Sequence, residues 1–214
     1  MRKLLISILS LICVVVIASC SDDDTDYVPS YRTDLLCLLT NGDSLATDLL
    51  LDDGRRFSLS QRVYTALPNS MLRCLCRYTI NDDSAGAHIY DITKVSCYTP
   101  APADSFEVHP QEPVNVVSLW KSGGFINLCL SPLVISKTSV LYDFSIDSVT
   151  QSADSKTIMH TSFLFQRKKE SVEAYSTKLY HSIPLHSSAY PCTFDSMYIY
   201  VNTYEGMKVY PFGK

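Results

Sequence analysis

The feature that most constrains the fold is an alternation of apolar and polar side chains with a period of two. The apolar residues Leu72, Cys74, Cys76, Tyr78 and Ile80 occupy every second position of one segment. Successive side chains of a strand point to opposite faces, so this pattern predicts a strand with one buried face. Comparable short runs recur along the chain, and no long amphipathic helix is evident. The sequence therefore predicts an all-β protein.

Residues 34–99 predict a barrel of five short strands. Leu35–Leu39 and Leu49–Leu51 are apolar runs, and Asp53-Gly54 follows the second of them. Asp-Gly between apolar runs is a strong hairpin signal, because glycine adopts the positive φ of the turn at little cost. His88–Tyr98 supplies the last strand. Five strands in so short a segment suit a small closed barrel, which leaves no exposed sheet edge.

A proline-rich linker, residues 100–113, separates this barrel from a second β domain. The linker contains four prolines, which donate no backbone hydrogen bond and disfavour sheet interiors. Residues 114–214 return to alternating and apolar runs and end in a hairpin around Glu205-Gly206. About seven antiparallel strands over this length indicate a β-sandwich.

Residues 1–19 are typical of a secretory signal peptide. Arg2 and Lys3 precede an apolar run, and small residues stand directly before Cys20. We interpret this pattern as a lipobox, with cleavage before Cys20 and fatty acylation of that cysteine. A transmembrane helix would need roughly 20 apolar residues, and this run is shorter and contains serines. A signal peptide that is cleaved without lipidation is the other alternative.

An acidic segment follows the predicted lipidation site. Ser21-Asp22-Asp23-Asp24 resembles the export signal that sends lipoproteins of Bacteroidota to the outer face of the outer membrane. We expect a protein held in the outer membrane by lipid on Cys20 and exposed to the cell exterior. Residues 20–33 would then form an acidic tether. The alternative is a solvated acidic spacer without a sorting role.

Six cysteines remain if the predicted signal peptide is removed and Cys20 is acylated. An oxidising compartment permits disulfides among them, but a domain of this size does not need them. Cys74 and Cys76 face the same side of one predicted strand, yet a single Cys-x-Cys is weak evidence for a metal site. We interpret most of the six as small buried hydrophobic residues and leave room for one disulfide. The six are Cys37, Cys74, Cys76, Cys97, Cys129 and Cys192.

No residue pattern rises to a catalytic signature. His181, His186 and Cys192 lie close in sequence without a recognisable motif, and we interpret the histidines as surface or partly buried residues. The acids Asp52-Asp53 and Asp82-Asp83 could serve a glycosidase or bind calcium. Aspartate is, however, favoured in turns for its local hydrogen bonds, and we prefer that interpretation. We therefore predict no catalytic residue, no cofactor and no metal site.

Charge and aromatic content narrow the choice of partner. The chain carries 22 acidic and 18 basic residues, and acidic residues also outnumber basic ones in the predicted barrel. This balance argues against nucleic acid, which binds to basic grooves. Tyr198, Tyr200 and Tyr204 would share one strand face with Asn202. Such a face suits contact with a protein or a sugar, although we favour an ordinary sandwich face covered by its neighbour.

Three motifs, taken together with the lipobox, resemble the NigD-like lipoprotein family. They are Leu51-Asp52-Asp53-Gly54, then Trp120-Lys121-Ser122-Gly123-Gly124-Phe125-Ile126-Asn127-Leu128, and finally Val201-Asn202-Thr203-Tyr204-Glu205-Gly206. The resemblance covers nearly the whole mature chain. It implies an N-terminal OB domain and a C-terminal β-sandwich domain, and it carries over no catalytic residues. Cys74 and Cys76 are not a recognised feature of the family.

The function expected from these observations is non-enzymatic. We predict a binding or accessory lipoprotein whose ligand is an unidentified protein or glycan. The family name derives from an association with a bacteriocin gene cluster, so immunity or self-protection is the alternative function. An envelope hydrolase is a less favoured third hypothesis.

Overall fold

The computed structural model describes residues 30–81, 86–134, 140–167 and 175–214. Strands predominate in these ranges, and the one described helix is a short 3₁₀ turn, η1 (Ala103–Ser105). The prediction of an all-β protein is confirmed. Within the same ranges, the search for a helix long and apolar enough to cross a membrane finds none.

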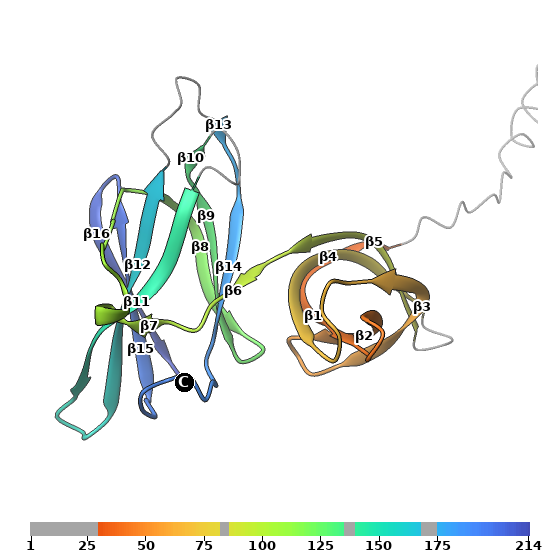
Figure 1. Ribbon diagram of the computed structural model, residues 1–214, viewed down its shortest axis with the longest axis horizontal. Coiled ribbons are helices and arrows are strands. Elements are labelled where there is room, and N and C mark those ends of the chain that lie inside the picture. Colours follow the sequence, from red (N-terminus) through yellow and green to blue (C-terminus); the bar gives the residue numbers. More distant parts are fainter. Residues whose placement is uncertain (1–29, 82–85, 135–139, 168–174) are drawn as a thin grey trace, which may run out of the picture. The chain divides into compact units, whose positions relative to one another are not determined.

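Five strands of the barrel close on themselves. Every described strand belongs to one compact unit, Tyr31–Lys214. The barrel strands pair in the order β1-β2-β3-β5-β4, with β3 and β5 parallel (Figure 1). This is the strand order of an OB fold, so the predicted five-stranded OB-like barrel is confirmed. The strands are β1 (Arg32–Thr40), β2 (Leu45–Leu51), β3 (Arg56–Tyr64), β4 (Met71–Asn81) and β5 (Gly86–Lys94).

Side-chain alternation builds the core of the barrel. Cys74, Cys76 and Tyr78 of β4 are buried, as the period of two predicts, and they pack against leucines of β1 and β2. The predicted turn between β2 and β3 also forms. Gly54 has a φ of 88°, and its N–H donates to the Leu51 carbonyl at 3.0 Å. A residue with a Cβ rarely adopts this φ, which explains the glycine.

Nine further described strands, two of them only two residues long, form two packed sheets. One sheet has the order β16-β15-β12-β11-β7 and the other has the order β6-β14-β9-β8. Leu128 and Ile183 of the four-stranded sheet share one apolar core with Phe144 and Met159 of the five-stranded sheet. The strands are β6 (Ser96–Cys97), β7 (Ala101–Pro102), β8 (Asn115–Ser122), β9 (Phe125–Ser131), β11 (Val140–Gln151), β12 (Thr157–Arg167), β14 (Leu179–Pro184), β15 (Ser196–Thr203) and β16 (Gly206–Gly213).

The sandwich is mixed rather than wholly antiparallel. β12 and β15 run parallel, as do β6 with β14 and β7 with β11. Parallel neighbours need a crossover connection, and the chain between β12 and β15 supplies one by way of β14 in the other sheet. A separate two-stranded sheet pairs β10 (Leu133–Val134) with β13 (Tyr175–Ser176).

The proline-rich segment 100–113 pairs with the sandwich at several points. Ala101 lies beside β11, and Gln111 forms a bridge with Phe165. Glu112 accepts a hydrogen bond from the Arg167 guanidinium at 2.7 Å. Strand β7 of this segment lies at the edge of the five-stranded sheet. Proline is tolerated there because its missing N–H costs no hydrogen bond between strands. These contacts tie the segment to the second half of the chain, and the proposed domain boundaries stay a prediction.

Strand β9 is buried on both faces. Leu128 and Leu130 point into the sandwich core. Phe125, Asn127 and Cys129 alternate with them and therefore point to the opposite face, yet each is at most 9% exposed. A second layer must cover that outer face, and the contacts described next show that the barrel does so.

Candidate functional site

A buried ion pair lies where the barrel meets the outer face of the four-stranded sheet. Arg73 of β4 donates two hydrogen bonds to Asp52, from Nη1 to Oδ1 at 2.5 Å and from Nη2 to Oδ2 at 2.7 Å. Asp52 directly follows β2, at the start of the turn to β3. A bidentate pair of guanidinium and carboxylate is a strong polar contact that fixes direction as well as distance.

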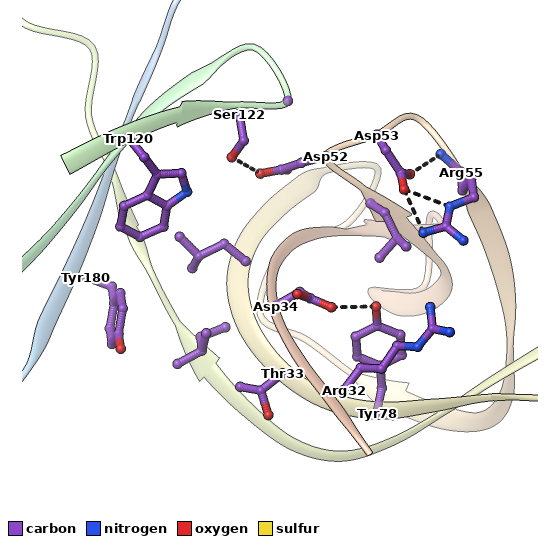
Figure 2. A pocket seen from close by; sticks show the side chains of 14 residues that line it. Arg32, Thr33, Asp34, Asp52, Asp53, Arg55, Tyr78, Trp120, Ser122 and Tyr180 are labelled. Carbon is purple, nitrogen blue, oxygen red and sulfur yellow. Dashed lines mark hydrogen bonds and ion pairs between the residues drawn. The ribbon is translucent and has the colours of Figure 1, made fainter. Parts of the chain in front are cut away.

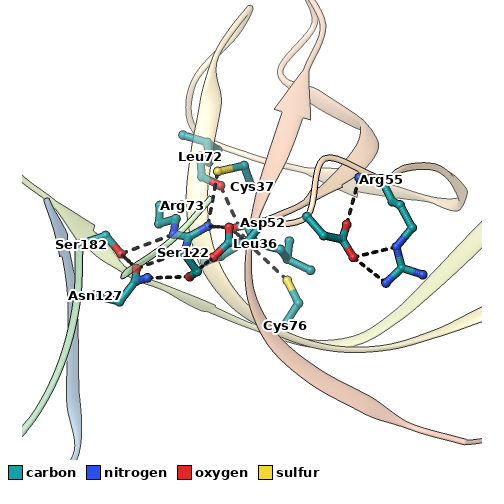
Figure 3. A network of polar contacts seen from close by, with 12 residues as sticks. Leu36, Cys37, Asp52, Arg55, Leu72, Arg73, Cys76, Ser122, Asn127 and Ser182 are labelled. Carbon is teal, nitrogen blue, oxygen red and sulfur yellow. Dashed lines mark hydrogen bonds and ion pairs between the residues drawn. The ribbon is translucent and has the colours of Figure 1, made fainter. Parts of the chain in front are cut away.

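Three side chains of the sandwich complete the cluster (Figure 3). Ser122 Oγ donates to Asp52 Oδ2 at 2.5 Å, and Asn127 Nδ2 donates to Ser122 Oγ at 2.9 Å. Asn127 Oδ1 accepts from Arg73 Nη2 at 3.0 Å and from Ser182 Oγ at 2.7 Å. We call the five residues Asp52, Arg73, Ser122, Asn127 and Ser182 the polar clamp. It joins the barrel to the sandwich.

The sheet register places the sandwich half of the polar clamp. Asn127 of β9 pairs directly with Trp120 of β8 and with Ser182 of β14. Directly paired residues project from the same face of a sheet. Ser122 lies two positions beyond Trp120 and therefore projects from this face as well. Small polar side chains here leave room for the long guanidinium of Arg73.

The two charged side chains of the polar clamp are largely shielded from solvent. The side chain of Arg73 is 1% exposed, and that of Asp52 is 18% exposed. Burial by itself lowers the pKa of Arg73, but the hydrogen bonds and the charge of Asp52 outweigh it and hold this pKa above its ordinary value. The guanidinium also lies 4.4 Å from the ring centroid of Phe125. Asp52 and Arg73 both belong to the barrel, so the arrangement of barrel and sandwich depends on their hydrogen bonds to Ser122 and Asn127.

Gly123 lies against Asp52 in the turn between β8 and β9. Its φ is +58°, and a Cβ at this position would lie 2.4 Å from Asp52 Oδ1. The next residue, Gly124, also has a positive φ of 79°, but a Cβ there would meet nothing within 4 Å. Both positions favour glycine for the conformation of the turn. Gly123 is needed in addition because Asp52 occupies the space beside it.

The neighbouring carboxylates of Asp52 and Asp53 have different roles. Asp53 Oδ1 accepts the Arg55 N–H at 3.0 Å, and Asp53 Oδ2 accepts from Arg55 Nε at 2.7 Å. This local bonding is the turn chemistry that the sequence predicts. For Asp52 the same prediction is wrong, because its carboxylate bonds to Arg73 and Ser122 instead. The second predicted acidic pair, residues 82–83, lies outside the described residues.

A cavity of about 710 Å³ adjoins the polar clamp. Ligand sites for small molecules commonly have about 300–1,000 Å³. Figure 2 shows Trp120 and Tyr180 of the sandwich at one side and Arg32, Asp34 and Tyr78 of the barrel at the other. The Tyr78 hydroxyl donates to Asp34 Oδ2 at 2.8 Å. The cavity therefore combines flat aromatic surfaces with groups that donate and accept hydrogen bonds.

A second cavity, of about 310 Å³, also borders Asp52 and Arg73. Its lining includes Cys37 and Cys97. Arg73 Nη1 lies 3.8 Å from the Cys37 sulfur, but burial outweighs this cation and raises the pKa of the Cys37 thiol. A thiol with a raised pKa is a weak nucleophile. The second cavity therefore offers no activated cysteine at Cys37.

The residues first considered for catalysis do not assemble into one site. His181 is 1% exposed and lies in the sandwich core against the rings of Tyr142 and Phe144. Burial lowers the pKa of His181 to about 4, and neither ring nitrogen finds a hydrogen-bond partner among the described residues. The interpretation of His181 as a surface or partly buried residue is wrong. His186 and Cys192 line a different cavity, of about 460 Å³.

The six cysteines among the described residues are all free thiols. Cys74 and Cys76 face the same side of β4, as predicted, with their sulfurs 3.4 Å apart. No cluster of three or more metal-ligating side chains occurs in the part of the chain that the structure describes. The predicted lipidation site Cys20 and the acidic segment 21–24 lie outside the described residues. The buried thiols are those of Cys37, Cys74, Cys76 and Cys129.

The tyrosine face of β15 is partly covered. Tyr198 and Tyr200 are half-buried, and His160 of β12 contacts both. His160 Nδ1 lies 2.8 Å from the Tyr200 hydroxyl, and Asn202 donates to the Gln111 carbonyl at 2.7 Å. These contacts favour an ordinary sandwich face over a dedicated docking surface.

Two residues of the polar clamp, Arg73 and Ser182, carry no signal of their own in the sequence. Arg73 lies on the polar face of a predicted strand, where an exposed arginine is the ordinary expectation. Asp52, Ser122 and Asn127 do fall within two of the motifs that resemble the NigD-like family. The structure brings these two motifs together, and their shared contact is the signal that sequence reasoning lacked.

Comparisons with known proteins support the fold. No family model matches the sequence, and no curated protein matches it either. The chain is similar to the structure of a NigD-like immunity protein from Bacteroides caccae, with a TM-score of 0.62 and 21% identity over 88% of this chain and 94% of that chain. A protein of unknown function from Bacteroides vulgatus has a TM-score of 0.65 and 14% identity, with 86% and 91% covered.

A candidate lipoprotein from Bacteroides fragilis is also similar, with a TM-score of 0.59 and 14% identity over 86% of this chain and 98% of that chain. These similarities confirm, at the level of the fold, the resemblance to NigD-like proteins. None of the three proteins is described as an enzyme.

Proposed function

We propose that this chain is a lipid-anchored binding protein of the bacterial outer membrane that faces the cell exterior and acts without catalysis. The observation that carries the proposal is the polar clamp, which holds two β modules beside a cavity of about 710 Å³. A cavity whose walls come from both modules keeps its shape only if their arrangement is fixed. Pre-organisation of this kind favours binding, because less freedom is lost when a ligand arrives.

The acids around the cavity favour binding over hydrolysis. Asp52 is engaged by Arg73, Asp53 by Arg55, and Asp34 by the Tyr78 hydroxyl. A hydrolase of the glycosidase type needs one protonated and one ionised carboxyl group facing the same bond. The pKa of Asp53 lies below its ordinary value because of its hydrogen bonds to Arg55, which favours the ionised form of this carboxyl group.

The anchor is the thiol of Cys20 in this proposal. Each buried methylene of a fatty acyl chain contributes about 0.8 kcal/mol, and two or more chains make attachment stable. Similarity in fold to a candidate lipoprotein supports this assignment. Mass spectrometry of protein from the native host should find acylated Cys20 at the N-terminus, and Cys20→Ser should release the protein from membranes. Digestion of intact cells by an added protease should remove the wild-type protein.

Photo-crosslinking in intact cells tests the binding function. A benzophenone amino acid in place of Trp120 or Tyr180 should give a defined adduct, because both side chains line the cavity. The same amino acid in place of Tyr64, which is 71% exposed and lies outside the cavity lining, is the matched control. Absence of any adduct at both cavity positions would contradict the proposal, and so would turnover of envelope glycans or peptides by the purified protein.

Immunity to a bacteriocin is the second candidate function. The similarity in fold to a NigD-like immunity protein favours it. Expression of the full chain in a sensitive strain should then raise survival in the presence of the toxin, and Cys20→Ser should abolish this protection. Unchanged survival would leave a binding function without an immunity role.

A further inference from the structure

The cavity beside the polar clamp has two chemically different sides. Its sandwich side carries Trp120 and Tyr180, and its barrel side carries Arg32, Asp34 and the ion pair of Asp53 with Arg55 (Figure 2). A ligand that fills this space must present a flat apolar surface to one side and hydrogen-bonding groups to the other.

The two aromatic side chains share one face of the sheet. Trp120 of β8 pairs with Asn127 of β9, and Tyr180 of β14 pairs with Cys129 of the same strand. Asn127 and Cys129 are two positions apart on β9, so all four side chains project from the outer face. Trp120 and Tyr180 thus flank β9 from its two neighbouring strands, and both are half-buried.

The indole of Trp120 is available to a ligand. None of the described residues accepts a hydrogen bond from its Nε1, and no described ring stacks on it. Tryptophan at such a position usually bonds through its N–H. Its flat face and its free donor point to a ligand with an apolar face and with oxygen atoms at the edge of that face.

The charges on the barrel side are balanced. Asp53 is paired with Arg55, and Asp52 with Arg73, which leaves Arg32 and Asp34 as one charge of each sign. A site for an anionic ligand such as a nucleotide would carry an excess of cationic side chains, and this cavity has no such excess. Carboxylate and guanidinium side by side instead suit hydroxyl groups, which donate to the first and accept from the second.

We propose that this cavity binds a neutral glycan, with the C–H face of one pyranose ring stacked on Trp120 or Tyr180 and its hydroxyls directed to Asp34 and Arg32. A pyranose ring has an apolar face of C–H groups and a rim of hydroxyls, which matches both sides of the cavity. This inference rests on the proposed binding function and names the class of ligand for the same site.

Tryptophan fluorescence tests the inference directly, because Trp120 is the one tryptophan in the chain. The full-length protein is titrated with neutral oligosaccharides of glucose, galactose, mannose and N-acetylglucosamine, and then with oligogalacturonate and a random peptide mixture. At least one neutral oligosaccharide should give a saturable shift in emission. A shift confined to the anionic sugar or to peptides, or no shift with any sugar up to millimolar concentration, would overturn the inference.

Variants separate stacking from general damage. Tyr180→Ala should weaken sugar binding about tenfold, which is the effect of about 1.4 kcal/mol. Tyr180→Phe keeps the ring and should retain binding within about twofold. Tyr204→Ala removes a tyrosine that is 56% exposed and not part of the cavity lining, so it is the matched control. Equal weakening by Tyr204→Ala and Tyr180→Ala would contradict the proposed site.

The photo-crosslinking result distinguishes the two proposals. A protein or peptide adduct at Trp120 combined with no response to sugars would overturn the glycan inference and leave the binding function standing. Absence of both an adduct and a fluorescence response would overturn the binding function as well.

Discussion

The two faces of the four-stranded sheet are buried in different ways. The inner face contributes Ile126, Leu128 and Ile183 to an apolar core, together with His181, whose ring nitrogens find no partner among the described residues. The outer face contributes Asn127 and Ser182 to the polar clamp, where their side-chain oxygens are hydrogen-bonded. One sheet thus has a mainly apolar contact on one side and a hydrogen-bonded, polar contact on the other.

This difference indicates that the two faces have different roles, one in stability and one in orientation. Burial of apolar surface is strong but non-directional, so the inner face stabilises the sandwich without fixing how a second module docks on it. The hydrogen bonds between the modules are directional, and another docking geometry would lose the bond from Arg73 to Asn127 and the bond from Ser122 to Asp52. The polar clamp therefore specifies the position of the barrel against the sheet, and with it the shape of the cavity.

The largest effect should follow from removing the charge of Asp52. Asp52→Asn keeps the shape of the side chain but leaves the guanidinium of Arg73, which is 1% exposed, without its counter-ion. Breaking a buried pair in this way costs about 3–5 kcal/mol. Urea unfolding of the purified protein measures this loss.

Asp53→Asn is the matched control for that variant. Asp53 is the next residue, its side chain is 50% exposed, and asparagine can replace it in the turn. Its effect on the free energy of unfolding should be a small fraction of that of Asp52→Asn. Equal effects of the two substitutions would show that Asp52 acts only through the local turn.

A smaller effect should come from adding a methyl group to the turn of the β8–β9 hairpin. Gly123→Ala and Gly124→Ala both place a Cβ at positive φ, which costs about 1–2 kcal/mol. Only the Cβ at residue 123 meets the Asp52 carboxylate, at 2.4 Å. The free energy of unfolding of Gly123→Ala should therefore be lower than that of Gly124→Ala by about 1 kcal/mol. Thermal unfolding of the pair measures the difference, and identical stabilities would contradict the close approach.

His181 should make the inner face sensitive to pH. Its pKa is about 4 in the folded protein and about 6.5 when the chain unfolds. The unfolded state therefore gains a proton first as the pH falls, so stability is full above pH 6.5 and is lost between pH 6.5 and 4. The loss from His181 between pH 7 and pH 5 should be about 2 kcal/mol.

His181→Phe isolates this contribution. The substituted ring is apolar and fits a site lined by aromatic rings. Unfolding measured at both pH values should show a pH dependence that is smaller by about 2 kcal/mol in the variant. The same pH dependence in both proteins would mean that His181 is protonated or solvated in the folded state.

Local patterns carried much of the fold. The period of two in residues 72–80 and the Asp-Gly and Glu-Gly turns predict strands and hairpins that the structure contains. These features depend on neighbouring residues alone, which is why the sequence shows them. The parallel pairing of β12 with β15 depends instead on a crossover between two sheets. The sequence of neither strand predicts this pairing.

The candidate site was less accessible from the sequence for the same reason. Arg73 follows the alternation as a polar residue, and its burial arises only because another module covers it. Asp52 has the composition of a turn residue, and its partner lies 21 positions further along the chain. The sequence around His181 gives no sign of burial, and the side chain lies in the core only because of its place in the sheet. Contacts between distant elements determine all three environments.

A double-mutant cycle between Asp52 and Ser122 tests most directly whether the polar clamp joins the barrel to the sandwich. Their hydrogen bond at 2.5 Å links the two modules, so Asp52→Ala and Ser122→Ala should be non-additive. We expect a coupling energy of about 1–3 kcal/mol in the free energy of unfolding. A coupling energy of zero within error would mean that the two side chains do not meet in solution and that the polar clamp does not hold the barrel against the four-stranded sheet.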